Sequence, residues 1–165
     1  MRSRRSAGLL LFRHDDEGRV QVLLAHPGGP LWATRDAGAW TVPKGEFDAG
    51  EEGWSVARRE FEEETGQPPP DGHPIDLGEI LQKGGKTVLA WALEGDLDPA
   101  AARSNTFPLE WPPRSGGWIT VPEIDRVEWF APDEAKRRIK DTQIPFIDRL
   151  LVALRDRSPR GPERA

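Results

Sequence analysis

Residues 45–67 read GEFDAGEEGWSVARREFEEETGQ and contain the densest group of acidic residues in the chain. From residue 51 to residue 66 the apolar positions recur with helical period, and three prolines at 68–70 end the helix. An apolar stripe that can pack against a sheet is made by Trp54, Ala57 and Phe61. The stretch therefore predicts an amphipathic helix that follows an acidic, glycine-containing loop.

Three carboxylates fall on one side of this predicted helix. At about 100° per residue, Glu60, Glu63 and Glu64 occupy one wedge of roughly 100°. Glu62 points about 160° away from Glu60, toward solvent. Like charges at these spacings destabilise a helix by roughly 0.2–0.5 kcal/mol per pair. Two explanations are open: a solvated acidic face, or a site in which a hard divalent cation offsets the repulsion.

Segments typical of strands precede the helix. Residues 8–12 (GLLLF) and 19–25 (RVQVLLA) are apolar runs on either side of HDDEG. Because Asp and Gly favour a chain reversal, the two runs predict a β-hairpin. A loop rich in Gly and Pro follows, and residues 40–42 form a short extended segment that Pro43 is expected to end.

The part of the chain after the helix also alternates between strand and helix patterns. Residues 75–81 and 86–93 predict two strands joined by a Gly-Gly turn. Residues 95–118 predict a long irregular loop, whose aromatic residues favour a role in binding. A short strand is expected at 127–130, and a helix begins at Pro132 and continues to about residue 139. A last helix is expected to bury one stripe made of Ile147, Leu150, Leu151 and Leu154.

Composition excludes several classes of site. The chain has 165 residues, which is enough for one domain with a core. It has no cysteine, so a disulfide framework, a thiol nucleophile, a zinc ribbon and an iron–sulfur site are excluded. The three histidines, His14, His26 and His73, are far apart in sequence and disfavour a histidine-centred zinc site. A net charge of −5 leaves no basic footprint for stable nucleic-acid binding.

The domain boundaries follow from the ends of these patterns. We expect a flexible basic arm at 1–5, one folded domain at 6–155 and a disordered tail at 156–165, which has no apolar face. No apolar run approaches the ~20 residues of a membrane span, and the basic start lacks a signal-peptide core. A cytoplasmic protein without a membrane partner is expected, as a monomer or homodimer.

The acidic stretch resembles the Nudix box, the signature GX5EX7REUXEEXGU of Nudix hydrolases, in which U is a bulky apolar residue. Its fixed positions are matched in register by Gly45, Glu51, Arg59, Glu60, Phe61, Glu63, Glu64 and Gly66. Seven exact matches at roughly 10% each arise by chance in fewer than about one chain in ten thousand. The one departure is Gln67 at the final apolar position, which bears on packing and not on ligands.

The resemblance implies an α/β fold, the α/β/α sandwich of the family, with a mixed β-sheet and the box on one side. It also implies Mg²⁺ or Mn²⁺ as cofactor, with the carboxylates of Glu60, Glu63 and Glu64 and the carbonyl oxygen of Gly45 as ligands. Such a cation neutralises a diphosphate and lowers the pKa of a bound water, which gives a nucleophile at neutral pH. The bound cation would remove the repulsion between the carboxylates.

The resemblance further implies a general base that takes the proton of water. We favour Glu63 over Glu60 for this role. Some members of the family supply one more acidic ligand or base from a loop after the box. Glu110 and Glu123 are the candidates for that residue here.

Three more residues have roles implied by the box. Arg59 and Glu51 are expected to pair and hold the loop onto the helix, the alternative being an ordinary surface ion pair. Lys44 is a candidate contact to a phosphate oxygen, the alternative being a solvated lysine. Stacking on a nucleobase needs an exposed aromatic face. The candidates for it are Trp32, Trp40, Trp111 and Trp118.

The lead-in WTVPKGEF is similar to the PKGH-type start of diadenosine tetraphosphate hydrolases and diphosphoinositol polyphosphate relatives. We therefore expect Mg²⁺-dependent hydrolysis of a phosphoanhydride in a nucleoside diphosphate linked to another moiety, with dinucleoside polyphosphates as the first choice. (d)NTPs, ADP-ribose and other nucleotide sugars come second. The chain has no tyrosine, a residue that some dinucleoside-polyphosphate enzymes carry downstream of the box. A non-catalytic nucleotide-binding Nudix domain and a metal-free acidic interaction helix are the alternatives.

Overall fold

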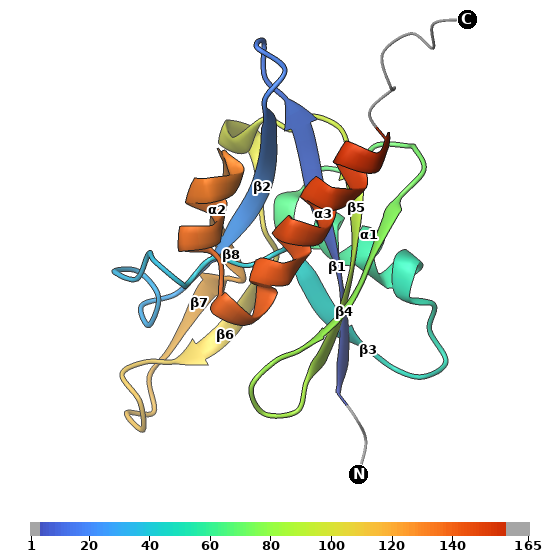
Figure 1. The fold of residues 1–165 in the computed structure, drawn as a ribbon. Helices are drawn as coiled ribbons and strands as arrows, with labels where there is room; N and C mark the ends of the chain where they lie inside the picture. Colours follow the sequence, from blue (N-terminus) through green and yellow to red (C-terminus); the bar gives the residue numbers. More distant parts are fainter. Residues whose placement is uncertain (1–3, 158–165) are drawn as a thin grey trace, which may run out of the picture.

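A computed structural model describes residues 4–157 of the chain (Figure 1). The strands are β1 (Arg5–His14), β2 (Val20–Pro27), β3 (Lys44–Phe47), β4 (Ile75–Leu81), β5 (Thr87–Glu94), β6 (Thr106–Glu110), β7 (Trp118–Pro122) and β8 (Ile124–Phe130). The α-helices are α1 (Gly53–Thr65), α2 (Pro132–Arg138) and α3 (Ile144–Arg157). Two short 3₁₀ helices are η1 (Pro99–Ala101) and η2 (Asp141–Gln143).

The main sheet is mixed. Its order is β4-β5-β1-β2-β8, with β3 paired to β1. Strand β1 is antiparallel to β2 and β3 and parallel to β5. Figure 1 shows α1 behind this sheet and α2 and α3 in front of it. The expected α/β/α sandwich with a mixed sheet is confirmed.

The alternation of side chains along β1 builds one core on each face of the sheet. Leu9 and Leu11 pack in the same buried cluster as Phe61 of α1. Leu10 and Phe12 pack on the other side, in the cluster that contains Leu150 of α3. Because β1 is central, both of its faces are apolar and its sequence reads as a continuous hydrophobic run. The two layers of helices are thereby fixed on one scaffold.

Most elements expected from the sequence are confirmed. The first hairpin forms, with Phe12 opposite Val22. The strands expected at 75–81 and 86–93 are β4 and β5, and the helices expected from periodicity are α1, α2 and α3. In α3, Ile147 and Leu150 are buried. The other two residues of the expected stripe, Leu151 and Leu154, are partly buried against the same cluster.

The segment around Pro43 differs from the expectation. In residues 40–42 only Trp40 and Thr41 make bridges, which are isolated, and the regular strand β3 begins after Pro43, at Lys44. Proline lacks a backbone N–H, but its carbonyl group still accepts the hydrogen bond that Leu9 donates at 3.1 Å. The chain therefore bends at Pro43 while it stays hydrogen-bonded to β1, and the regular strand follows the proline.

The prediction of a long irregular loop at 95–118 is also wrong in part. This stretch contains β6, which pairs with β7 in a separate two-stranded hairpin. The pairing runs from Thr106 opposite Pro122 to Glu110 opposite Trp118. Pro108 lies inside β6 and masks the strand pattern in the sequence. A two-stranded hairpin tolerates proline because each strand has a free edge, where no N–H is needed.

The first and last elements of the structure overlap the arm expected at 1–5 and the tail expected at 156–165. Arg5 is the first residue of β1, and α3 continues to Arg157. Residues 1–3 of the expected arm and 158–165 of the expected tail lie outside the described residues. None of the helices in residues 4–157 is long and apolar enough to span a membrane.

Candidate active site

Helix α1 carries the acidic residues and packs against the sheet through its apolar face. Ala57 and Phe61 are fully buried. Trp54 contacts Trp91 of β5, with ring centroids 5.8 Å apart. The helix ends at Gly66, which adopts a left-handed φ of 73°. The expected amphipathic helix is confirmed, and its orientation fixes the direction in which the glutamates point.

The loop before α1 is closed onto the helix by an ion pair. Arg59 Nη1 lies 2.9 Å from Glu51 Oε2, so the two residues make the expected contact. The backbone N–H of Glu51 donates to the carbonyl oxygen of Asp48 at 2.9 Å, which closes a turn in the same loop. The hydrogen bond from Arg59 is the main reason that the pKa of Glu51 lies below its usual value.

Gly45 lies against the carboxylate of Glu60. A Cβ atom at position 45 would fall 2.1 Å from Glu60 Cδ and 2.3 and 2.4 Å from its two oxygens. Such distances are far below van der Waals contact, so only glycine leaves room for this carboxylate. Strand β3, paired to β1 with Gly45 opposite Ala7, and helix α1 thus bring two of the expected ligands together.

Glu64 is buried, and one of its oxygens has no hydrogen-bond partner among residues 4–157. The backbone and the charge of Lys44, at the start of β3, both act to lower the pKa of this carboxyl group, which places the side chain near that strand. Oε2 is buried and makes no hydrogen bond within the structure. Burial raises the pKa of Glu64 to about 8, although the charge of Lys44 acts in the opposite direction. A buried carboxylate oxygen without a donor is costly, and a cation is a partner that would satisfy it.

Glu63 and Glu62 are both exposed, as Glu62 was expected to be. The charge of Glu63, together with burial as the larger cause, raises the pKa of Glu60. Within residues 4–157, no three His, Asp or Glu side chains gather closely enough to hold a metal ion as they are placed. Glu64 is buried and Glu60 and Gly45 are half-buried, whereas Glu63 lies at the solvent edge of the wedge.

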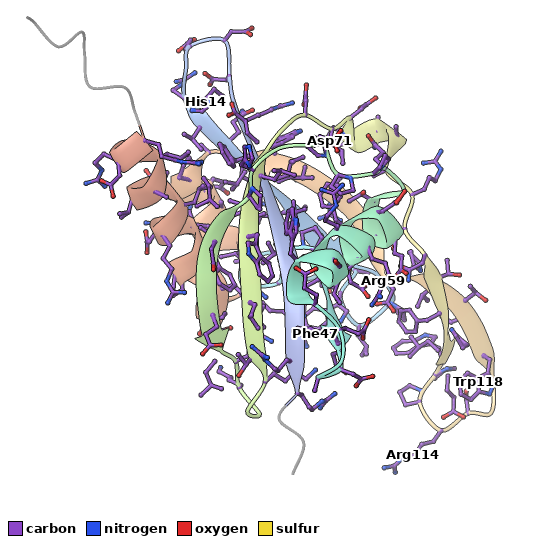
Figure 2. The ribbon with its side chains drawn as sticks, turned by 90° about the vertical axis from the view of Figure 1, so that its right-hand side faces the viewer. His14, Phe47, Arg59, Asp71, Arg114 and Trp118 are labelled. Atoms are coloured by element: carbon purple, nitrogen blue, oxygen red, sulfur yellow. The ribbon has the colours of Figure 1, made fainter. Side chains whose placement is uncertain are left out.

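Glu110 and Glu123, the candidates for an additional acidic ligand or base after the box, lie in different places in the structure. Glu110 Oε1 accepts a hydrogen bond of 2.9 Å from the backbone of Arg114, at the turn of the β6–β7 hairpin. Figure 2 shows Arg114 at the far end of this hairpin from Arg59 and α1. The charge of Glu123, in contrast, raises the pKa of both Glu60 and Glu64. Glu123 is therefore the candidate that lies near the wedge.

Sequence reasoning missed Asn105, which joins α1 to the segment that carries Glu123. Its backbone N–H donates to the carbonyl oxygen of Glu63 at 2.8 Å, and its own carbonyl oxygen accepts from Glu123 N–H at 2.9 Å. These contacts use the backbone, which leaves no residue pattern in the sequence. The base of the β6–β7 hairpin is thereby attached to the end of the acidic helix.

One of the four tryptophan candidates for base stacking is wrong. Trp40 is fully buried, and its Nε1 donates to Asp36 at 2.8 Å. Trp118 is 65% exposed on β7 (Figure 2), while Trp32 and Trp111 are half-buried. These three keep a ring surface that a nucleobase could reach.

An acidic loop and helix packed on one face of a mixed α/β/α sandwich is the arrangement that the Nudix box implies. Residues 2–150 match the family model of the NUDIX domain, and the chain therefore belongs to the Nudix family. The match covers both the box and the strands and helices that position it.

Curated relatives and solved structures agree with this family. The asymmetrical bis(5'-nucleosyl)-tetraphosphatase of Rattus norvegicus is 33% identical over 100 residues, which are 54% of this chain and 64% of that protein. The Mus musculus protein of the same name is 32% identical over the same shares. The chain thus spans less than two thirds of the length of the curated relatives that it matches.

Two solved structures show the same fold. A C. elegans Ap4A hydrolase in a binary complex has a TM-score of 0.64 and 21% identity, covering 92% of this chain and 98% of that one. The NUDIX domain of Shewanella oneidensis NrtR, complexed with ADP ribose, has a TM-score of 0.64 and 16% identity, covering 93% and 90%. At these identities the likeness concerns the fold alone.

Proposed function

We propose that this chain is a divalent-cation-dependent Nudix hydrolase that cleaves a phosphoanhydride bond in a dinucleoside polyphosphate. The observation that carries the proposal is the buried oxygen of Glu64, which has no hydrogen-bond partner among residues 4–157, beside Glu60 and Gly45 in a Nudix box that departs from the signature only at Gln67. Hard oxygen donors in this number suit Mg²⁺ or Mn²⁺. Glu60, Glu63, Glu64 and the Gly45 carbonyl oxygen would hold the cation.

Each part of the box then has a defined task. A bound Mg²⁺ supplies charge neutralisation of the diphosphate and a more acidic water. Glu63, at the solvent edge of the wedge, takes the proton from the attacking water, with Glu60 as the alternative base. The Arg59–Glu51 pair holds the loop so that the Gly45 carbonyl oxygen and Glu60 keep their relative positions.

The choice of substrate rests on the relatives. The curated relatives are named as tetraphosphatases of bis(5'-nucleosyl) compounds, and the PKG lead-in to the box points the same way. A NUDIX domain of the same fold is complexed with ADP ribose, and we keep ADP-ribose and nucleotide sugars as the second candidate class. Both classes place a phosphoanhydride next to a nucleoside.

A substrate panel tests this proposal. Purified protein is incubated with diadenosine polyphosphates, (d)NTPs, ADP-ribose and other nucleotide sugars, each with Mg²⁺ or with EDTA, and the products are separated by chromatography. We expect turnover of diadenosine polyphosphates with Mg²⁺ and none with EDTA. Turnover of ADP-ribose alone would move the proposal to the second class. Absence of turnover in every arm would favour a non-catalytic nucleotide-binding domain.

A further inference from the structure

Residues 40–43, which lead into β3 and the box, lie beside the connection between α2 and α3. Trp40 N–H donates to the carbonyl oxygen of Arg138 at 3.0 Å, and Lys140 N–H donates to the carbonyl oxygen of Trp40 at 2.8 Å. Trp40 and Ile139 thereby form an isolated parallel bridge. After this bridge the connection continues into the 3₁₀ helix η2, whose backbone does not extend the pairing.

The side chain of Gln143, the last residue of η2, continues the contact where the backbone stops. Gln143 is 0% exposed, and its Oε1 accepts a hydrogen bond of 3.0 Å from Val42 N–H. Its Nε2 donates to Thr41 Oγ1 at 2.9 Å and to Gln82 Oε1 at 3.0 Å. Because the Val42 N–H can only donate, it fixes which end of the amide faces the lead-in. Both hydrogens of Nε2 then meet acceptors, so the buried amide is satisfied in a single orientation.

The backbone between Val42 and Gly45 has little freedom to absorb a shift. Pro43 has a fixed φ, and the residue before a proline is restricted away from helical conformations. The Pro43 carbonyl oxygen accepts from Leu9 N–H at 3.1 Å. A Cβ at position 8 would fall 2.9 Å from this same oxygen, so only glycine there permits the close approach of β1. A displacement at Val42 is therefore carried along the chain toward Gly45.

Gly45 is the point at which such a displacement affects the candidate cation site. Its carbonyl oxygen is one of the groups that would hold the cation, and a Cβ on it would fall 2.1 Å from Glu60 Cδ. We propose that Gln143 is a positioning residue, which acts through Val42 to keep the Gly45 carbonyl oxygen in place against the carboxylates of α1. This inference rests on the proposed function and adds to its site a residue that lies far from the box in sequence.

Mn²⁺ binding to the metal-free protein tests this role without turnover. Electron paramagnetic resonance quantifies free Mn²⁺, at a temperature well below the unfolding midpoint that each protein has in EDTA. Gln143→Met keeps the length of the side chain but takes away the acceptor of Val42 N–H. We expect it to weaken Mn²⁺ binding about tenfold, the scale on which loss of a residue that orients a metal ligand acts. Gln143→Asn, which is one methylene shorter, is the second variant and is expected to weaken binding as well.

Gln82→Met is the matched control, because it removes one partner of the same amide and leaves the contact with Val42 in place. We expect Gln82→Met to lower the unfolding midpoint in EDTA, as Gln143→Met does, because each leaves a polar group of this network without its partner. Its Mn²⁺ affinity should nevertheless stay within about twofold of the wild type.

Three results would overturn the positioning role: wild-type Mn²⁺ affinity in either folded Gln143 variant, equal weakening by Gln82→Met, or no Mn²⁺ binding by the wild type. These outcomes are distinguishable from failure of the proposed function. A wild type that hydrolyses nothing, but binds Mn²⁺ more tightly than both Gln143 variants, keeps the positioning role and loses the activity. An active wild type with unchanged Mn²⁺ affinity in those variants keeps the activity alone.

Discussion

Replacement of Gly45 by alanine is expected to lower kcat for Mg²⁺-dependent hydrolysis by about a hundredfold. The added methyl group would lie 2.1 Å from Glu60 Cδ, so the carboxylate must move away from the β3 backbone. A displacement of about 1 Å at a catalytic group costs on the order of a hundredfold in rate. Steady-state kinetics on diadenosine tetraphosphate, with a thermal unfolding curve to confirm the fold, measures this effect.

Gly50→Ala provides the control in the same loop. Apart from the chain neighbours of Gly50, no atom of the described residues 4–157 lies within 4 Å of a Cβ at position 50, so this substitution adds a methyl group to open space. We expect Gly50→Ala to keep kcat within about twofold of the wild type, since nothing has to move. A Gly45→Ala enzyme with unchanged kcat would show that the contact with Glu60 has no part in catalysis.

Glu64→Gln is expected to stabilise the metal-free protein while removing its response to Mg²⁺. The pKa of Glu64 is about 8 in the folded protein and near 4.5 when unfolded, so between these values the folded state binds the extra proton. The wild type therefore loses stability as pH rises through this window, by about 1.4 kcal/mol per pH unit. Glutamine does not titrate, so the stability of the Glu64→Gln variant does not fall in this way. The difference in stability between the variant and the wild type therefore grows toward pH 8.

Thermal unfolding in EDTA at pH 5 and pH 8 measures this difference. We expect similar midpoints at pH 5, and a midpoint for Glu64→Gln that is several degrees higher at pH 8, at roughly 2–4 °C per kcal/mol. Added Mg²⁺ should then raise the midpoint of the wild type by mass action and leave that of the variant nearly unchanged. Identical midpoints for the two proteins at pH 8 in EDTA would contradict the burial of an uncompensated carboxylate.

The acidic helix was predictable from the sequence because its signals are local. Helical spacing places Glu60 and Glu64 on one side and Glu62 on the other, and the three prolines after Gln67 set the end. The Arg59–Glu51 contact follows in turn, since both residues belong to one short loop and helix. Such features need no information from the rest of the chain.

Features that depend on distant segments were not predictable. Pro108 hid the strand β6, whose partner β7 is found only when the chain folds back on itself. The burial of Glu64 depends on the start of β3, and the exposure of Trp118 and burial of Trp40 depend on tertiary packing. The hydrogen bond from the backbone N–H of Lys140 to the carbonyl oxygen of Trp40 requires α2 and the sheet to be assembled, so it leaves no pattern in the sequence.

The most direct test of the central claim is the rate of diadenosine tetraphosphate hydrolysis with Mg²⁺ by the wild type, Glu63→Gln and Glu62→Gln. Both glutamates are exposed on α1, but only Glu63 belongs to the acidic wedge. We expect Glu63→Gln to lower kcat by about 10²–10⁴-fold, as for loss of a general base, and Glu62→Gln to stay close to the wild type. Equal rates for all three proteins would contradict catalysis by the acidic wedge of α1.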